Sequence, residues 1–309
     1  MSAAATLVMA GVAKRYGRTR ALDGLDLSVP AGSIFGLIGS NGAGKTTAMT
    51  VAVGLLRADG GAIDVLGAGP YAPETHAGRV ALLPQDARFP PHARVEELLI
   101  YYARLQGLDA GRAVASAGEV MDWVHLRDRR RSPVRTLSHG MHRRLSIAQA
   151  FLGEPELVLL DEPLNGLDPR EAARVRDLVR ARRGRQTIVI SSHNLPDIEA
   201  LCDTVAFVEG GRRVRQDALD AVTRRRHSVA YLLARPLGEG DTPRERVPEA
   251  AWEVSTDGLR WTASFEPPLT VEAVNARVAP RLASAGGLLE IRRGSDLESV
   301  YLGSVIGNQ

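Results

Sequence analysis

The sequence predicts an α/β fold with a mostly parallel sheet over residues 1–216, followed by a small C-terminal α+β domain over 217–309. Apolar runs that resemble buried strands alternate with helical patterns in the first part, as in sheets that helices cover on both faces. One of these runs ends in a glycine-rich stretch, and a helical pattern follows it. From residue 217 onward, β-rich segments and a hairpin pattern replace the alternation. We therefore expect two domains.

The strands of the first domain are expected in order along the chain. Residues 25–29 alternate apolar and polar side chains, as a half-buried strand does. The others are apolar runs bounded by turn residues, at 33–39, 61–67, 79–84, 156–163, 186–193 and 204–211. A charged helix is expected around 170–183, between two of these strands.

Between residue 90 and about 153 the periodicity is helical throughout, which predicts a helical subdomain over about 86–153. In its first helix, spacings of three and four residues put five apolar side chains on one face, and Gly107 ends the helix. The five are Val95, Leu98, Leu99, Tyr102 and Leu105.

The second domain is expected to begin with the strand 228–234 and to form a hairpin around Asp257-Gly258. A helix near 270–285, the strand 288–293 and a last helix follow. Ser295 and Glu298 have the spacing of a capping box at the start of that helix. Residues 235–250 are predicted to be a mobile loop, and the domain is interpreted as a regulatory or dimer-stabilising module.

Composition excludes several classes of protein. With 44% hydrophobic and 24% charged residues, the chain has an ordinary globular composition. The run 46–56 is among the longest without charge and is about half of the roughly 20 residues that span a bilayer. We expect neither a transmembrane segment nor an export signal. The net charge of +3 is too small to suggest a nucleic-acid partner. Cys202 is the single cysteine, so no internal disulfide is expected, as in a reducing cytosol.

The stretch "GSNGAGKTT" contains one of only two lysines in the chain and fits the phosphate-binding pattern G-x-x-x-x-G-K-[ST]. Glycines let backbone N–H groups surround phosphate oxygens, and the following helix directs its positive end at them. A lysine ammonium is compact enough to reach two phosphates inside a tight loop, whereas a guanidinium is broader. The predicted nucleotide-binding residues are Gly39, Asn41, Gly42, Ala43, Gly44, Lys45, Thr46 and Thr47.

Two carboxylates follow the apolar strand at 156–163. We expect Asp161 and the Thr46 hydroxyl to hold Mg²⁺, and Glu162 to polarise the water that attacks the γ-phosphate. Taken alone, the pair is equally consistent with a strand that meets solvent. The phosphate loop earlier in the chain favours the catalytic interpretation.

Residues from about 6 to 216 resemble the ATP-binding cassette of ABC transporters. The resemblance rests on six segments that occur in this order: the phosphate loop, "LLPQD" (82–86), "TLSHGMHRRLSIAQA" (136–150), the carboxylate pair (161–162), "NGLDP" (165–169) and "SSHNL" (191–195). It implies an α/β P-loop NTPase cassette with a helical subdomain, and an ATPase that uses ATP and Mg²⁺. Gln85 resembles the glutamine that senses Mg²⁺ and the attacking water. His193 resembles the histidine that touches the γ-phosphate.

The resemblance implies further nucleotide contacts. Tyr16 resembles the aromatic that stacks on adenine, and Asp168 is similar to the carboxylate of the dimer-contact loop. Ser138 and Gly140 belong to a segment similar to the family's signature motif, in which His139 and Met141 stand where glycine and glutamine are usual. These two departures, and the tail at 296–302, resemble the type-2 exporter branch.

One phosphate loop and one signature in the chain imply a head-to-tail homodimer with ATP between the copies. Without membrane spans of its own, the chain is expected to power a separate transmembrane permease from the cytoplasmic side of the membrane, through a groove around 90–110. A soluble ABC-type ATPase with a regulatory role and no transport is the alternative, and a copper-site maturation ATPase is another. A P-loop kinase does not need the signature, and a chromosome-maintenance ATPase should carry a long coiled coil.

Overall fold

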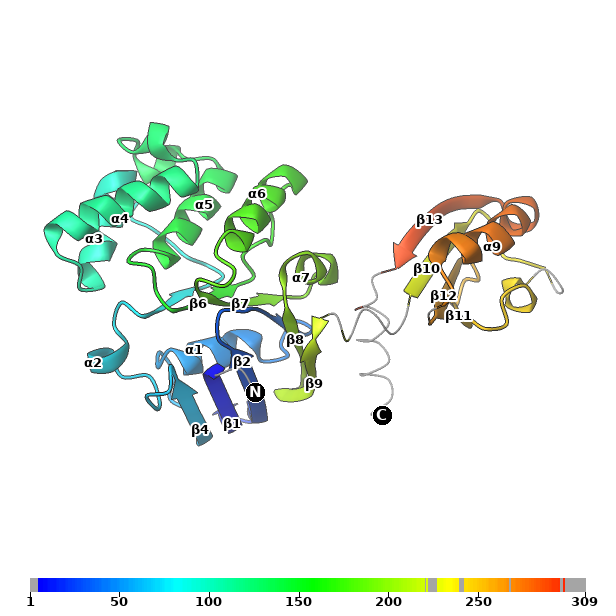
Figure 1. Ribbon diagram of the computed structural model, residues 1–309, viewed down its shortest axis with the longest axis horizontal. Coiled ribbons are helices and arrows are strands. Elements are labelled where there is room, and N and C mark those ends of the chain that lie inside the picture. Colours follow the sequence, from blue (N-terminus) through cyan, green and yellow to red (C-terminus); the bar gives the residue numbers. More distant parts are fainter. Residues whose placement is uncertain are drawn as a thin grey trace. The chain divides into compact units, whose positions relative to one another are not determined.

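The structure is a computed structural model that describes residues 5–219, 221, 227–238, 242–266, 268–294 and 297. The chain divides into two compact units, Met1–Gln216 and Asp217–Gln309, each of which is described by itself. Figure 1 labels the helices and strands of both. Among the described residues, no helix is both long enough and apolar enough to cross a membrane.

The first unit is built on a six-stranded sheet with the order β5-β6-β7-β3-β8-β9. Neighbouring strands from β5 to β8 run parallel, which confirms the predicted α/β class. The strands are β3 (Ile34–Ile38), β5 (Val80–Leu83), β6 (Leu157–Asp161), β7 (Thr187–Ser192), β8 (Thr204–Glu209) and β9 (Arg212–Ala218). Every residue of β3, β6 and β7 is buried, so their continuous apolar runs reflect burial on both faces.

A second sheet corrects one expectation. The predicted strands at 25–29 and 61–67 lie in β2 (Thr19–Pro30) and β4 (Gly60–Val65), which pair antiparallel with β1 (Ala5–Tyr16) in a separate three-stranded sheet. The sequence did not predict β1, because Gly11, at φ +58°, lies in a register shift between Met9 and Val12 that breaks the alternation.

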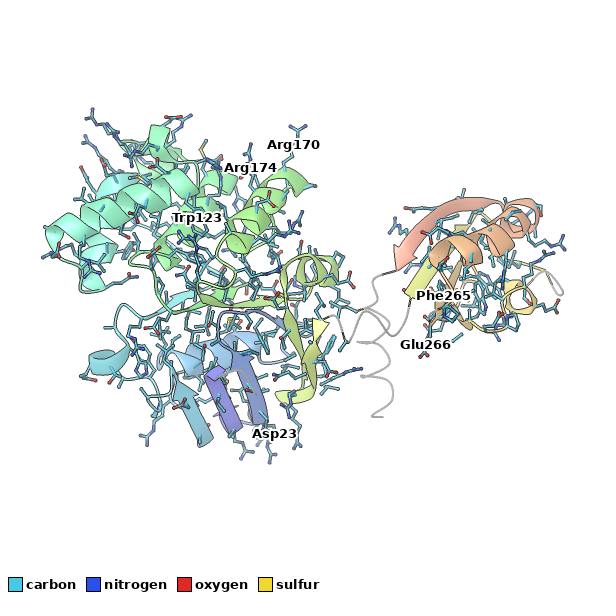
Figure 2. The ribbon with its side chains drawn as sticks, viewed as in Figure 1. Asp23, Trp123, Arg170, Arg174, Phe265 and Glu266 are labelled. Atoms are coloured by element: carbon cyan, nitrogen blue, oxygen red, sulfur yellow. The ribbon has the colours of Figure 1, made fainter. Side chains whose placement is uncertain are left out.

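An ion pair ties this second sheet to β9. The Asp23 carboxylate on β2 accepts hydrogen bonds from Nε and Nη2 of Arg212 at 3.1 and 2.8 Å, and Figure 2 labels Asp23. The Asp23 N–H also donates to the Gly211 carbonyl. The contact with Arg212 is the main cause that lowers the pKa of the Asp23 carboxyl below its usual value.

Three helices of the first unit lie in the predicted helical subdomain: α3 (Val95–Leu105), α4 (Ala110–Trp123) and α5 (His139–Ala150). Helix α1 follows the phosphate loop, and α7 follows the loop that carries His193. Helix α3 packs on α4, with Val95, Leu98 and Leu99 buried, but Leu105 is 64% exposed. The apolar face of α3 therefore stops one turn earlier than its period predicts, because burial needs a facing element as well as a pattern. The helices are α1 (Lys45–Ala52), α2 (Pro73–His76), α3 (Val95–Leu105), α4 (Ala110–Trp123), α5 (His139–Ala150), α6 (Pro169–Arg180) and α7 (Leu195–Leu201), with short 3₁₀ turns at Arg127–Arg129 and Val134–Thr136.

The second unit is an antiparallel sheet with the order β11-β12-β10-β13, against which α9 (Val271–Gly286) packs. The predicted hairpin, helix and strand are all present in it. Its strands are β10 (His227–Leu233), β11 (Ala251–Val254), β12 (Arg260–Phe265) and β13 (Leu288–Gly294), with a 3₁₀ turn at Pro243–Glu245 inside the predicted loop. Tyr231, Trp261 and Phe265 are buried in its core. Ser295, Glu298 and all of the tail at 296–302 except Leu297 lie outside the described residues, as does residue 267.

Candidate functional site

The candidate site lies at one edge of the parallel sheet, where the chain leaves β3, β5, β6 and β7. Because these strands are parallel, their carboxyl ends meet at the same edge, which is the usual ligand-binding position in such sheets. A cavity of about 580 Å³ opens there. Its lining residues are Ala21, Asn41, Gly42, Gly44, Lys45, Thr46, Thr47, Gln85, Glu162, Asn165 and His193.

The glycines of the loop between β3 and α1 are required by the backbone. A Cβ at Gly39 would lie 2.4 Å from the Val208 carbonyl oxygen, so the loop packs directly on β8. Gly44 has φ +107°, and a Cβ there would lie 2.5 Å from the Ala21 oxygen. Gly42 has φ +85° with open space where its Cβ would be. Its bare backbone therefore faces the cavity, which suits close approach of an anion.

The Lys45 ammonium bonds to the loop that precedes it. Nζ donates to the carbonyls of Gly39 at 2.7 Å and Ser40 at 3.1 Å, and it lies 3.6 Å from Oε1 of Glu162. The side chain is buried and lines the cavity. A buried ammonium needs compensating partners, and here two carbonyl dipoles and one carboxylate supply them.

Asp161 and Thr46 are joined directly, since Oγ1 of Thr46 donates to Oδ2 of Asp161 at 2.6 Å. The other carboxylate oxygen, Oδ1, accepts from the buried Ser191 hydroxyl on β7. A hydroxyl and a carboxylate are the hard oxygen donors that Mg²⁺ prefers, and two protein ligands with the rest from phosphates is usual for this ion. The pair therefore fits the expected Mg²⁺ site. The described residues contain no cluster of three or more metal-binding side chains that would hold a metal alone.

Glu162 is held from several sides. Its φ of +48° is left-handed, which costs a residue with a side chain about 1–3 kcal/mol and is found where the surroundings enforce it. Its N–H donates to Oγ of Ser191 at 2.8 Å. Nδ1 of His193 lies 3.0 and 3.1 Å from its two carboxylate oxygens, so the histidine predicted to touch γ-phosphate contacts the predicted base in this structure. The carboxylate faces the cavity with its direction fixed.

The backbone carbonyls of residues 161–163 accept hydrogen bonds from an arginine that the sequence analysis did not single out. Arg143 on α5 donates through Nη2 to the carbonyls of Asp161, at 3.3 Å, and Glu162. Its Nε donates to the Pro163 carbonyl at 2.9 Å, and Nη1 to the Gln85 carbonyl at 3.1 Å. One guanidinium therefore links the loop after β5 to the end of β6.

Seven predicted residues do not line the cavity. Three of them, Gly39, Ala43 and Asp161, belong to the phosphate loop and the end of β6 beside it, and the other four lie elsewhere. Tyr16 lies at the turn from β1 to β2 and is 52% exposed. Ser138 is exposed and its Oγ accepts from the Met141 N–H at 3.3 Å, which caps the start of α5. The Asp168 carboxylate caps α6 by accepting from the N–H groups of residues 170 and 171 at 2.9 and 3.0 Å. Gly140 lies in the first turn of α5, beside the side chain of Glu171.

Sequence reasoning missed four residues that shape the site: Ala21, Arg143, Asn165 and Ser191. Asn165 lies inside the "NGLDP" segment, so that motif could have indicated it. Ala21 enters through β2, which belongs to the other sheet. Ser191 and Arg143 also lie inside quoted segments, "SSHNL" and "TLSHGMHRRLSIAQA". They act, however, through hydrogen bonds to groups far away in the sequence, and the segments carry no signal for those partners.

A glycine loop between a strand and a helix, a buried lysine and a hydroxyl–carboxylate pair at the carboxyl edge of a parallel sheet define a P-loop nucleoside triphosphatase. The family described as "ABC transporter" matches residues 22–165. The daunorubicin resistance ATP-binding protein DrrA3 of Streptomyces coeruleorubidus is 41% identical over 213 residues, which cover 68% of this chain and 67% of that protein. The chain belongs to the ATP-binding proteins of ABC transporters, and members of that family are ATPases.

Other relatives agree with this assignment. The Nod factor export ATP-binding protein I of Burkholderia thailandensis is 32% identical over 294 residues, which cover 94% of each chain, so the likeness extends into the second unit. A solved structure described as the ATP binding subunit of an ABC transporter superposes with a TM-score of 0.64 at 28% identity, over 71% of this chain and 92% of that one. The relatives with exporter names support the predicted branch of the family.

Proposed function

We propose that the chain is the ATP-hydrolysing subunit of an exporter, which powers a separate membrane permease when two copies close on ATP. It would act from the cytoplasmic side, held at the membrane by the permease. The name of the Nod factor export relative supports the direction of transport. The arrangement of the cavity supports the pairing.

The observation that carries the proposal is that the segment similar to the signature motif does not line the cavity. The described residues that line it come from the phosphate loop and the strand ends, and residues 137–141 contribute none. Ser138 and Gly140 lie instead at the exposed start of α5. A second copy, turned head to tail, would bring its Ser138, Gly140 and Asp168 against the nucleotide and complete the site.

The residues of the first half divide the chemistry between them. The Lys45 ammonium would give up its hydrogen bonds to the loop carbonyls and bind the β- and γ-phosphates instead. The α1 N-terminus would face the same anion. Thr46 and Asp161 would hold Mg²⁺, which when bound neutralises phosphate charge. Glu162 would accept the proton of the attacking water, while His193 fixes the direction of its carboxylate. Gln85 is proposed to contact the attacking water, and Tyr16 is proposed to contact the adenine.

A glutamine variant tests this assignment. We expect Glu162→Gln to bind ATP with the parental Kd, to lose about 10²–10⁴-fold in turnover, and to elute as a dimer with Mg²⁺-ATP but as a monomer without nucleotide. Glu119→Gln, at an exposed position on α4, is the matched control and should turn over at the parental rate. Hydrolysis by Glu162→Gln at the parental rate would contradict its role as the base.

The permease contact is proposed to lie on the helical subdomain. Tyr101 and Leu105, both on α3, are 58% and 64% exposed and lie within the range 90–110 where the permease groove is expected. We expect affinity purification from membranes to recover an integral membrane protein with the parental chain and less of it with Leu105→Ser. Recovery of no membrane protein with the parental chain would favour a soluble regulatory ATPase instead.

A further inference from the structure

Arg143 occupies a position that connects two parts of the first unit. It is the fifth residue of α5, the helix that Ser138 caps, and Figure 1 shows α5 on the side of the sheet where α6 also lies. Its guanidinium reaches from that helix to the loop after β5 and to the segment that follows β6. The start of α5 is therefore linked by one side chain to two of the loops that carry predicted site residues, those of Gln85 and Glu162.

The chemistry of this contact requires a guanidinium. All four acceptors that the structure records are backbone carbonyls, of Gln85, Asp161, Glu162 and Pro163. A planar fork with three nitrogen atoms can bind carbonyls on two loops at once, whereas a lysine ammonium is a single point. Burial lowers the pKa of Arg143, while the nearby carboxylates of Asp161, Glu162 and Asp86 oppose that change.

The contact also explains how Glu162 keeps an unfavourable backbone. At φ +48° the residue is strained unless its peptide groups are held. Its N–H is bound by Ser191 and its carbonyl by Arg143, so the two ends of the residue are fixed from β7 and from α5. Loss of the carbonyl contact would let the backbone relax and turn the carboxylate away from the cavity.

We propose that Arg143 is a positioning residue that holds Glu162 in its left-handed conformation and fixes it relative to the Gln85 loop. Through Arg143, the position of α5 sets the direction of the Glu162 carboxylate. The inference rests on the proposed role of Glu162 as the base. It adds that the base is competent only while α5 is in place.

The test compares Arg143→Lys and Arg143→Ala with the parental full-length chain. We expect both variants to lower kcat about 10–100-fold while the KM for ATP and the Kd of a fluorescent ATP analogue stay within about threefold, since the phosphate loop is untouched. Lysine should not rescue, because it keeps the charge but cannot span both loops. Arg180→Lys is the matched control, since Arg180 also donates two hydrogen bonds to a carbonyl, of Ala200, but away from the cavity.

A double variant separates the inference from the function on which it rests. In the Glu162→Gln background, adding Arg143→Lys should cause little further loss of turnover, because both changes remove the same aligned carboxylate. Parental kcat in Arg143→Lys, with Glu162→Gln inactive, would overturn the inference and leave the base assignment intact. Loss of ATP binding and of thermal stability together in Arg143→Lys would overturn it as well, because that result indicates a merely structural role. An active Glu162→Gln variant would overturn the base assignment itself.

Discussion

The two regions of this chain that we propose to form the two halves of a nucleotide site are built in opposite ways. At the carboxyl edge of the sheet, Lys45, Asp161 and Glu162 are buried, and each is bound by groups from other elements. At the start of α5, Ser138 and His139 are exposed, and the recorded hydrogen bond of the Ser138 side chain is the cap of its own helix.

The difference follows from what each half must do. Residues that bind charge inside a cavity need fixed partners, because a buried ion without them is costly. Residues that meet a nucleotide on another copy need to be accessible, and an exposed helix start offers free N–H groups at no such cost. Under the proposed function, the buried region is the half that is complete within one chain, and the exposed region is the half that a second copy uses.

The largest effect is expected at the buried half. Lys45→Ala removes the cation that balances both the loop carbonyls and a bound phosphate, so the Kd for ATP should rise at least about 100-fold. Isothermal titration with Mg²⁺-ATP measures this directly. Micromolar affinity in the variant would show that the ammonium is not part of the phosphate site. Lys14→Ala, at the other lysine, is the control and should bind ATP as the parent does, because Lys14 pairs with Asp59 outside the cavity.

A mixing experiment tests whether the halves come from different chains. Ser138→Glu places a carboxylate against the partner's phosphate and should abolish turnover without weakening nucleotide binding by the same copy. Mixed with Lys45→Ala, it should regain activity, because one intact site forms between the two variants. A mixture of Lys45→Ala with Glu162→Gln is the control and should stay inactive, since both damage the buried half. Equal activity of the two mixtures would contradict the division.

A smaller effect is expected from Ser191, which bonds to the Asp161 carboxylate and to the Glu162 backbone N–H. Ser191→Ala removes the partner of the Asp161 carboxylate and of the Glu162 N–H, and loss of such a supporting contact costs about 10–100-fold in metal affinity or turnover. We expect a lower kcat and a higher Mg²⁺ concentration at half-maximal rate. Ser228→Ala, at a buried serine of the second unit, should change neither quantity. An unchanged Mg²⁺ dependence in Ser191→Ala would count against the metal site.

The smallest effect distinguishes two roles of Asp168, the helix cap of α6 and the proposed contact with the nucleotide of a second copy. Asp168→Ala and Asp109→Ala each remove a helix cap, of α6 and α4, and each should lower the free energy of unfolding by about 1 kcal/mol. Urea unfolding measures this loss. Only Asp168→Ala should also lower the turnover, because only Asp168 is offered to the partner. Equal activities of the two variants would leave Asp168 a structural cap.

Local patterns in the sequence predicted much of the fold, because six strands of the first unit are short apolar runs between turn residues. Strand β1 was missed since Gly11 breaks its alternation. Strand β9 was missed because only its four residues 214–217 are partly buried and none is fully buried. The phosphate loop could be recognised because its spacing is fixed by one tight turn. Arg143 and Ser191 could not, because their partners are backbone and carboxylate groups that only the folded chain brings within reach.

The bonds from Lys45 to Gly39 and Ser40 have a consequence for the speed of nucleotide capture. Before ATP arrives, the Lys45 ammonium lies inside the loop and holds its shape. Binding of ATP then replaces the carbonyl oxygens around Nζ with phosphate oxygens. The phosphate loop itself does not have to become ordered first. Association should therefore be limited by diffusion and charge, slowing as ionic strength rises, with little dependence on temperature beyond that of the solvent.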